Sequence, residues 1–156
     1  QAVALNPEDF RYSGFLAWSM RAQPGRESES EPHHWQVIRA ATERLAINHS
    51  DYEARAALAL HLAALSHDSA ARGALLSLGD RRSLNMNVLA TLGLTLVLLD
   101  EAGEATAAYQ AAIERGLPVF LLRADPRLQQ ARDHPEFVQL FAKLSSSPVL
   151  AQGTDP

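Results

Sequence analysis

Apolar residues recur at three- and four-residue intervals along most of the chain, and alanine and leucine supply most of them. This spacing places them on one face of an α-helix, whereas a half-buried strand shows strict alternation of apolar and polar residues. Such alternation of β-branched and aromatic residues is almost absent, so the pattern predicts an all-α protein. The predicted helices cover about residues 7–23, 34–47, 52–65, 69–78, 84–99 and 101–115 (or 104–115).

Short polar segments separate these helices. The clearest is PGRESESEP, residues 24–32, in which proline, glycine and alternating Glu and Ser predict a solvated loop. The segment NHSD, residues 48–51, predicts a turn in which Ser50 or Asp51 is the N-cap of the next helix. Helices joined by such short connections pack antiparallel, so the sequence predicts a series of helical hairpins.

The hairpins repeat along the chain. ALNP at 4–7 and AINH at 46–49 are equivalent repeat ends, and they lie 42 residues apart, which is 34 plus an insertion of eight. The insertion is assigned to the loop at 24–32, and two further steps of 34 residues from His49 reach Ser83 and Leu117. A fixed period of this length indicates a repeat architecture built from helix–turn–helix units.

The best-matching hairpin, residues 86–117, resembles the tetratricopeptide repeat family. The residues that carry the resemblance are the Leu-Gly pair Leu92 and Gly93 on the first helix, and the small–aromatic–small set Ala105, Tyr109 and Ala112 on the second. Gly93 lets the two helix backbones approach, and Tyr109 fills the space between them. Residues 10–49 and 52–83 match less completely, and HEAT-like or Sel1-like repeats are alternative assignments.

This resemblance implies an α-solenoid of about three antiparallel hairpins. Residues 1–9 are then the end of a preceding repeat or an N-terminal cap, and residues 10–117 form the repeats. Residues 118–144 contain Asp125-Pro126 and His134-Pro135, which predict short helices with proline in the first turn. We expect these helices to cap the last hairpin, and residues 145–156 to form a flexible tail.

The predicted cap has an apolar face of its own. It consists of Phe137, Leu140, Phe141 and Leu144, whose spacing is that of one side of a helix. We expect this face to pack on the hairpin of residues 86–117.

Composition narrows the classes of function. The chain has 156 residues and a net charge of −4, unlike the basic surface of a nucleic-acid binder, so no nucleic-acid partner is expected. It has no cysteine, which excludes disulfides and thiolate chemistry and suits either the cytoplasm, which we favour, or the periplasm. No window reaches the roughly 18 apolar residues of a spanning helix, so no membrane insertion is expected.

The origin of the chain is also suggested by its composition. Thirteen of its 14 basic residues are arginine, and alanine and leucine are abundant, which is typical of a bacterium with a GC-rich genome. The chain opens on Gln1 and shows no signal-peptide pattern, so we expect a fragment of a longer protein.

The polar residues do not form a recognisable catalytic or metal-binding motif. His33 and His34 are adjacent in a predicted loop, and His61 and His67 do not share a helical face. There is no His-Glu-x-x-His pattern, no Gly-x-Ser-x-Gly turn and no phosphate-binding glycine loop. We therefore expect a protein that is not an enzyme, with no metal site and no cofactor.

The resemblance implies that the first helix of each hairpin lines a concave surface that binds a peptide or a partner protein. The residues it assigns to this surface are Arg11, Trp18 and Arg21 in the first hairpin, Glu53 and Leu60 in the second, and Asn87, Leu94 and Val97 in the third. Arginine there would pair with a carboxylate, and Asn87 would bind peptide backbone. Trp18 is either an anchor for the partner or a core residue between the first two hairpins.

The favoured function is a non-catalytic scaffold or adaptor within a larger bacterial protein or complex. An alternative is the regulatory sensor domain of a signalling or transcription-regulating protein, with a small ligand or peptide in the groove. A third is self-association through an apolar end near Val3 and Leu5.

Overall fold

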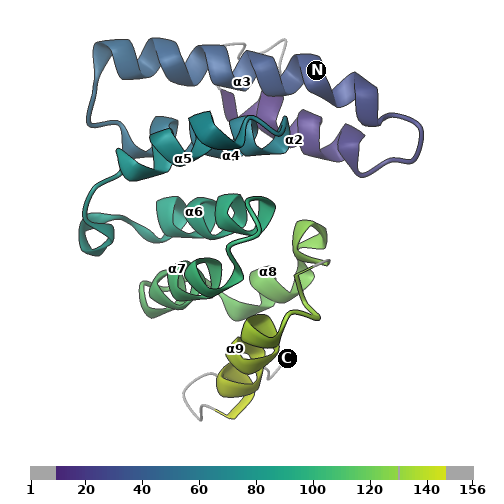
Figure 1. Cartoon of the computed structure of the whole chain (residues 1–156), viewed down its shortest axis with the longest axis vertical. Coiled ribbons are helices and arrows are strands. Elements are labelled where there is room, and N and C mark those ends of the chain that lie inside the picture. The colour runs from purple at the N-terminus through teal and green to yellow at the C-terminus, as the bar shows by residue number, and fades with distance from the viewer. Residues whose placement is uncertain (1–9, 130, 147–156) are drawn as a thin grey trace, which may run out of the picture. The chain divides into compact units, whose positions relative to one another are not determined.

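A computed structural model describes residues 10–129 and 131–146, and this part of the chain is all-α, as the sequence predicts. Eight α-helices in these residues pack mostly as sequential neighbouring pairs (Figure 1). The chain divides into two compact units, Gln1–Leu84 and Asn85–Pro156. The predicted N-terminal segment 1–9, with Val3 and Leu5, and residues 147–156 of the predicted tail lie outside the described residues.

The first unit contains four α-helices, each packed against the next. They are α2 (Phe10–Arg21), α3 (Glu27–Ile47), α4 (Tyr52–Ala64) and α5 (Asp68–Leu76), followed by a 3-10 turn at Arg81–Ser83. Helix α4 lies between α3 and α5, and most of its alanines are buried. Because alanine side chains are small, the helix backbones on either side can approach α4 closely.

The predicted loop at residues 24–32 is wrong from Glu27 onward, because α3 already begins at that residue. Glu27 and Glu29 lie in the first turn of α3, where negative charge stabilises the helix N-terminus. The Ser30 hydroxyl donates to the Glu27 carbonyl at 2.6 Å. Pro32 lies inside the helix, beyond its first turn, so its missing N–H removes one backbone hydrogen bond of α3.

Helix α4 begins at the turn that the sequence predicts, and its N-cap is Asp51. The Asp51 Oδ1 accepts a hydrogen bond of 2.9 Å from the Ala54 N–H, and its Oδ2 accepts one of 2.6 Å from Arg44. Burial alone raises the pKa of Asp51, but the Ala54 N–H and the Arg44 guanidinium lower it below its usual value overall. The carboxylate is therefore ionised at neutral pH and stabilises the turn between α3 and α4.

Substitution Asp51→Ala is expected to lower the free energy of unfolding by about 1 kcal/mol, because the cap and the Arg44 pair are both lost. The measurement is urea-induced unfolding followed by circular dichroism at neutral pH. Ser50→Ala is the control, since the Ser50 side chain is exposed and the structure places the cap at Asp51. Equal losses for the two variants would contradict the assignment of the cap.

The second unit begins with the hairpin that resembles a tetratricopeptide repeat. Helix α6 (Met86–Leu98) packs against α7 (Ala102–Glu114), and Asp100 in the turn between them has a φ of 60°. A Cβ added at Gly93 would lie 2.8 Å from Cε2 of Tyr109, whose side chain is buried. The predicted close contact between Gly93 and Tyr109 is therefore confirmed.

The C-terminal helices differ in part from the prediction. Helix α8 (Val119–Ala124) was not predicted, whereas Pro126 opens a 3-10 turn (Pro126–Leu128) and Pro135 opens α9 (Pro135–Ser146). Helix α9 packs against α7, and the rings of Phe137 and Tyr109 meet edge to face with centroids 6.1 Å apart. The predicted packing of this helix on the preceding hairpin is confirmed.

Candidate functional site

In the first unit, the residues predicted to bind a partner have unequal access to solvent. Arg11 and Glu53 are exposed and Trp18 is half-buried, whereas Leu60 is buried with 6% of its surface exposed. Leu60 lies on α4, which has a helix packed on each side. Leu60 is therefore not exposed in the structure, and its assignment to a partner-binding surface stays a prediction.

In the second unit, Asn87 is exposed and Val97 is half-buried, but Leu94 has only 3% of its surface exposed. Residues 92–96 of α6 are all buried. Leu94 is therefore not exposed in the structure, and its assignment to a partner-binding surface stays a prediction.

Arg21 has a structural partner. Its Nη1 donates to the Ala64 carbonyl at 2.6 Å, at the C-terminal end of α4, where helix carbonyls lack a partner within the helix. Its Cζ lies 5.9 Å from the centroid of the Trp18 ring. The structure thus brings Arg21 and Trp18 together, and Arg21 links α2 to α4.

The structure also brings two histidines together in the first unit, which the sequence did not predict. His34 from α3 and His61 from α4 lie with their Nδ1 atoms 2.8 Å apart, and both side chains are buried. The Trp18 ring from α2 meets the His34 ring edge to face, with centroids 5.3 Å apart. A Cβ on Gly14 of α2 would lie 3.2 Å from the His61 Nε2, so the cluster is closely packed.

The short distance between the two Nδ1 atoms restricts the protonation of the pair. One Nδ1 must donate and the other accept, so the two rings cannot both be charged in this arrangement. Burial is the largest cause that lowers the pKa of His34 from its ordinary 6.5 to about 4, and the positive charges of Arg21 and His33 contribute to the same shift. The His34 Nε2 has no hydrogen-bond partner among the described residues. His34 is thus held neutral in the core.

The sequence contained a signal that His34 is buried, namely its spacing relative to apolar residues of the same helix. His34, Val37, Ile38 and Ala41 follow the spacing of one helix face, and all four are buried. The loop predicted at 24–32 placed His34 at a helix end, which hid this spacing. The pairing with His61, 27 residues away, depends on how α3 packs against α4.

The arrangement of these histidines does not amount to a metal site. Among residues 10–129 and 131–146, no group of three or more His, Cys, Asp or Glu side chains could hold a metal ion. Both rings are buried, so neither can reach a substrate in solvent.

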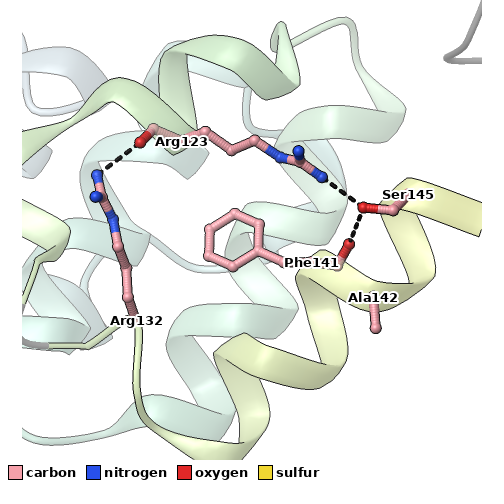
Figure 2. A pocket seen from close by; sticks show the side chains of 5 residues that line it. All are labelled: Arg123, Arg132, Phe141, Ala142 and Ser145. Atoms are coloured by element: carbon pink, nitrogen blue, oxygen red, sulfur yellow. Dashed lines mark hydrogen bonds between the residues drawn. The ribbon is translucent and has the colours of Figure 1, made fainter.

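A pocket of about 440 Å³ lies in the second unit, next to α8 and α9. It is lined by Arg123, Arg132, Phe141, Ala142 and Ser145. Figure 2 shows the Phe141 ring lying between the side chains of the two arginines. None of these residues was assigned to a binding surface from the sequence, because α8 was not predicted and Phe141 was assigned to the packed face of the cap.

Comparison with known proteins gives no relative from which a function could be transferred. The chain matches no protein-family model, and neither curated proteins nor solved structures give a significant match. None of the helices in the described part of the chain is long and apolar enough to cross a membrane.

Proposed function

We propose that the chain is a non-catalytic protein-interaction module built from tetratricopeptide-like helical hairpins. The observation that carries this proposal is the close contact between Gly93 on α6 and the buried Tyr109 on α7. This glycine–aromatic contact stands where the resemblance requires it. Ala105 and Ala112 of α7 are also fully buried, as close helix packing requires.

Rigid helical hairpins are suited to binding because their side chains keep fixed positions. Four of the side chains assigned to the binding surface on α2, α4 and α6 are exposed or half-buried: Arg11, Glu53, Asn87 and Val97. Large apolar side chains are also exposed, including Phe15 at 77% and Phe120 at 67%. Phe15 lies on α2 of the first unit and Phe120 on α8 of the second, so each unit carries an exposed large apolar side chain of its own.

The proposal is tested by selecting peptides from a phage-displayed library of random linear sequences against the full chain. Selected peptides are synthesised and titrated into the folded protein by calorimetry, and the affected backbone amides are mapped by NMR. We expect one-to-one binding that perturbs one contiguous surface, while scrambled peptides of the same composition bind more weakly. The proposal fails if no selected peptide binds the folded chain better than its scrambled form.

A further inference from the structure

We propose that the pocket between α8 and α9 binds an acidic side chain of a peptide partner, with a neighbouring apolar side chain of the peptide resting against Phe141. The inference rests on the proposed function and specifies the chemistry of the partner. The pocket volume of about 440 Å³ lies within the range of roughly 300–1,000 Å³ that is common for binding pockets.

The charge of the pocket favours an anion. Arg123 and Arg132 both line it, and neither forms an ion pair with a carboxylate among the described residues. The Asp125 carboxylate is occupied by Arg127, whose Nε and Nη2 donate to its Oδ1 and Oδ2 at 2.8 and 2.6 Å. Arg132 helps to lower the pKa of Asp125 through its charge, but its hydrogen bond goes to the main-chain carbonyl of Asp125 and not to its carboxylate. Neither guanidinium is therefore paired with a carboxylate within the described residues.

Both arginines are held in place by contacts inside the unit. Arg132 Nη2 donates to the carbonyls of Arg123 and Asp125 at 2.6 and 3.0 Å, which fixes it against the end of α8. Arg123 Nη2 donates to the Ser145 Oγ at 2.7 Å, and its Cζ lies 5.8 Å from the centroid of the Phe141 ring. A guanidinium that is already positioned loses less side-chain entropy when it binds a carboxylate.

Hydrogen-bond donors remain for a ligand. The hydrogen bond from Arg123 to Ser145 uses one of the two N–H groups of Nη2, and the Nε and Nη1 of Arg123 have no partner among the described residues. Ser145 accepts from Arg123 and donates to the Phe141 carbonyl at 2.9 Å, so its hydroxyl is already engaged (Figure 2). The second N–H of Nη2 and the N–H beside it on the same edge of the guanidinium can therefore form two parallel hydrogen bonds with a carboxylate.

Apolar side chains beside the pocket favour a peptide over a free inorganic anion. Phe120 precedes Arg123 by three residues on α8, and Val138 precedes Phe141 by three residues on α9, so each lies on the same helix face as its pocket residue. Phe120 is 67% exposed and Val138 is 54% exposed. A peptide with apolar side chains next to a carboxylate would contact both the arginines of the pocket and the exposed apolar side chains beside it.

The test uses two synthetic peptides that differ only in charge: acetyl-Ala-Leu-Glu-Leu-Ala-amide and the same peptide with Gln in place of Glu. Each is titrated into the full chain, and NMR follows the backbone amides of α8 and α9 and the Nε–H signals of the arginines. We expect the Glu peptide to shift the signals of Arg123 and Ser145, and the Gln peptide to bind about tenfold more weakly. Equal binding of the two peptides, or no shift at these residues up to millimolar concentration, would overturn the inference.

Variants locate the site. Arg123→Gln is expected to weaken binding of the Glu peptide about tenfold, and Arg123→Lys is expected to restore only part of it, because lysine cannot form the two-pronged contact. Arg115→Gln is the matched control, since it removes one positive charge from the same unit, and Arg115 bonds to the Ala111 carbonyl of its own helix. Unchanged circular dichroism spectra establish that the variants are folded. Equal weakening by Arg115→Gln and Arg123→Gln would show a general charge effect and reject the pocket.

The outcomes distinguish this inference from the proposed function. If peptides selected from the display library bind the chain but are insensitive to Arg123→Gln, the interaction module stands and the pocket inference falls. If inorganic phosphate alone displaces the Glu peptide at equal concentration, the site selects charge without the apolar contact, and the peptide assignment is rejected. If no peptide of any kind binds, the proposed function falls as well.

Discussion

Acidification from pH 7 to pH 5 is expected to lower the free energy of unfolding of the chain by about 2 kcal/mol, because His34 is buried in its neutral form. The pKa of His34 is about 4 in the folded chain, against an ordinary value of 6.5. Between these two values the unfolded chain binds a proton that the folded chain does not. Stability is therefore fully present above about pH 6.5, falls as the pH is lowered toward 4, and changes no further through this group below that.

The environment of His34 explains why protonation is unfavourable. Arg21 approaches from α2, His33 is the neighbour along α3, and His61 faces it from α4. A proton added to His34 would place a positive charge in the core near the Arg21 guanidinium. If His61 were charged as well, both Nδ1 atoms would carry a proton, and neither could accept the hydrogen bond between the two rings.

The measurement is urea-induced unfolding at several pH values between 7 and 5. His34→Asn removes the titrating ring and keeps an amide near the position of Nδ1, so the variant is expected to show a much flatter dependence on pH. His49→Asn is the control and is expected to retain the wild-type slope, because the His49 side chain is exposed and does not contribute to the pKa shift of His34. The interpretation is wrong if the wild type is equally stable at both ends of this range, or if His34→Asn retains the full slope.

The pH range from 7 to 5 distinguishes the effect of His34 on stability from the effects of the carboxylates. The pKa values of Asp51 and Asp125 are both lowered overall, because their hydrogen bonds and arginine partners outweigh the effect of burial. A carboxylate with a lowered pKa loses its stabilising contribution only as the pH falls through the range below its ordinary value of about 4. Loss of stability above pH 5 is therefore not due to these carboxylates, and the His34→Asn variant measures the part that comes from His34.

Helices that are marked by a capping residue or by the periodicity of their apolar residues could be predicted from the sequence. The start of α4 followed from Asp51, and the hairpin of α6 and α7 followed from an apolar run, a short polar turn and a second helix with regularly spaced alanines. Gly93 and Tyr109 were matched correctly because the repeat pattern relates positions on paired helices. Capping and periodicity act within a few residues, so they can be recognised without knowing the tertiary structure.

The start of α3 could not be predicted from the same signals. Proline, glycine and alternating Glu and Ser are typical of loops, yet residues from Glu27 onward are helical. Composition does not reveal that the Arg26 guanidinium binds Glu29 at 2.8 Å, that Ser30 is buried, or that α2 packs along this helix. Tertiary contacts of this kind outweigh weak local propensities.

Neither the buried histidine pair nor the pocket lined by Arg123 and Ser145 could be predicted from the sequence, for a different reason. His34 and His61 lie 27 residues apart, and the Arg123 and Ser145 side chains meet across 22 residues. Each contact depends on the angle and register at which two helices pack. The low exposure of Leu60 and Leu94 could not be predicted for the same reason, since the burial of a helix face depends on how many neighbours the helix has.

Gly93→Ala and Gly73→Ala are expected to change the free energy of unfolding in opposite directions, with a difference of about 2 kcal/mol between them. Alanine is the better helix former by about 1 kcal/mol at either position. Gly73 lies in α5 with no atom within 4 Å of an added Cβ, so this gain is retained and the variant is stabilised. At Gly93 the added Cβ would lie 2.8 to 3.0 Å from three ring atoms of Tyr109, and the overpacking outweighs the gain.

A second substitution tests whether Tyr109 is the cause. In a Tyr109→Leu background the ring that meets the added Cβ is absent, so Gly93→Ala is expected to be neutral or stabilising there, although Tyr109→Leu itself destabilises the unit. The four proteins of this double-mutant cycle are compared by urea-induced unfolding at neutral pH, and the coupling between the two sites is expected to be about 1–3 kcal/mol. A coupling near zero would mean that Gly93 is required for a reason other than its contact with Tyr109. The proposed interaction module rests on the contact between Gly93 and Tyr109. A coupling near zero would therefore also remove the support for that proposal.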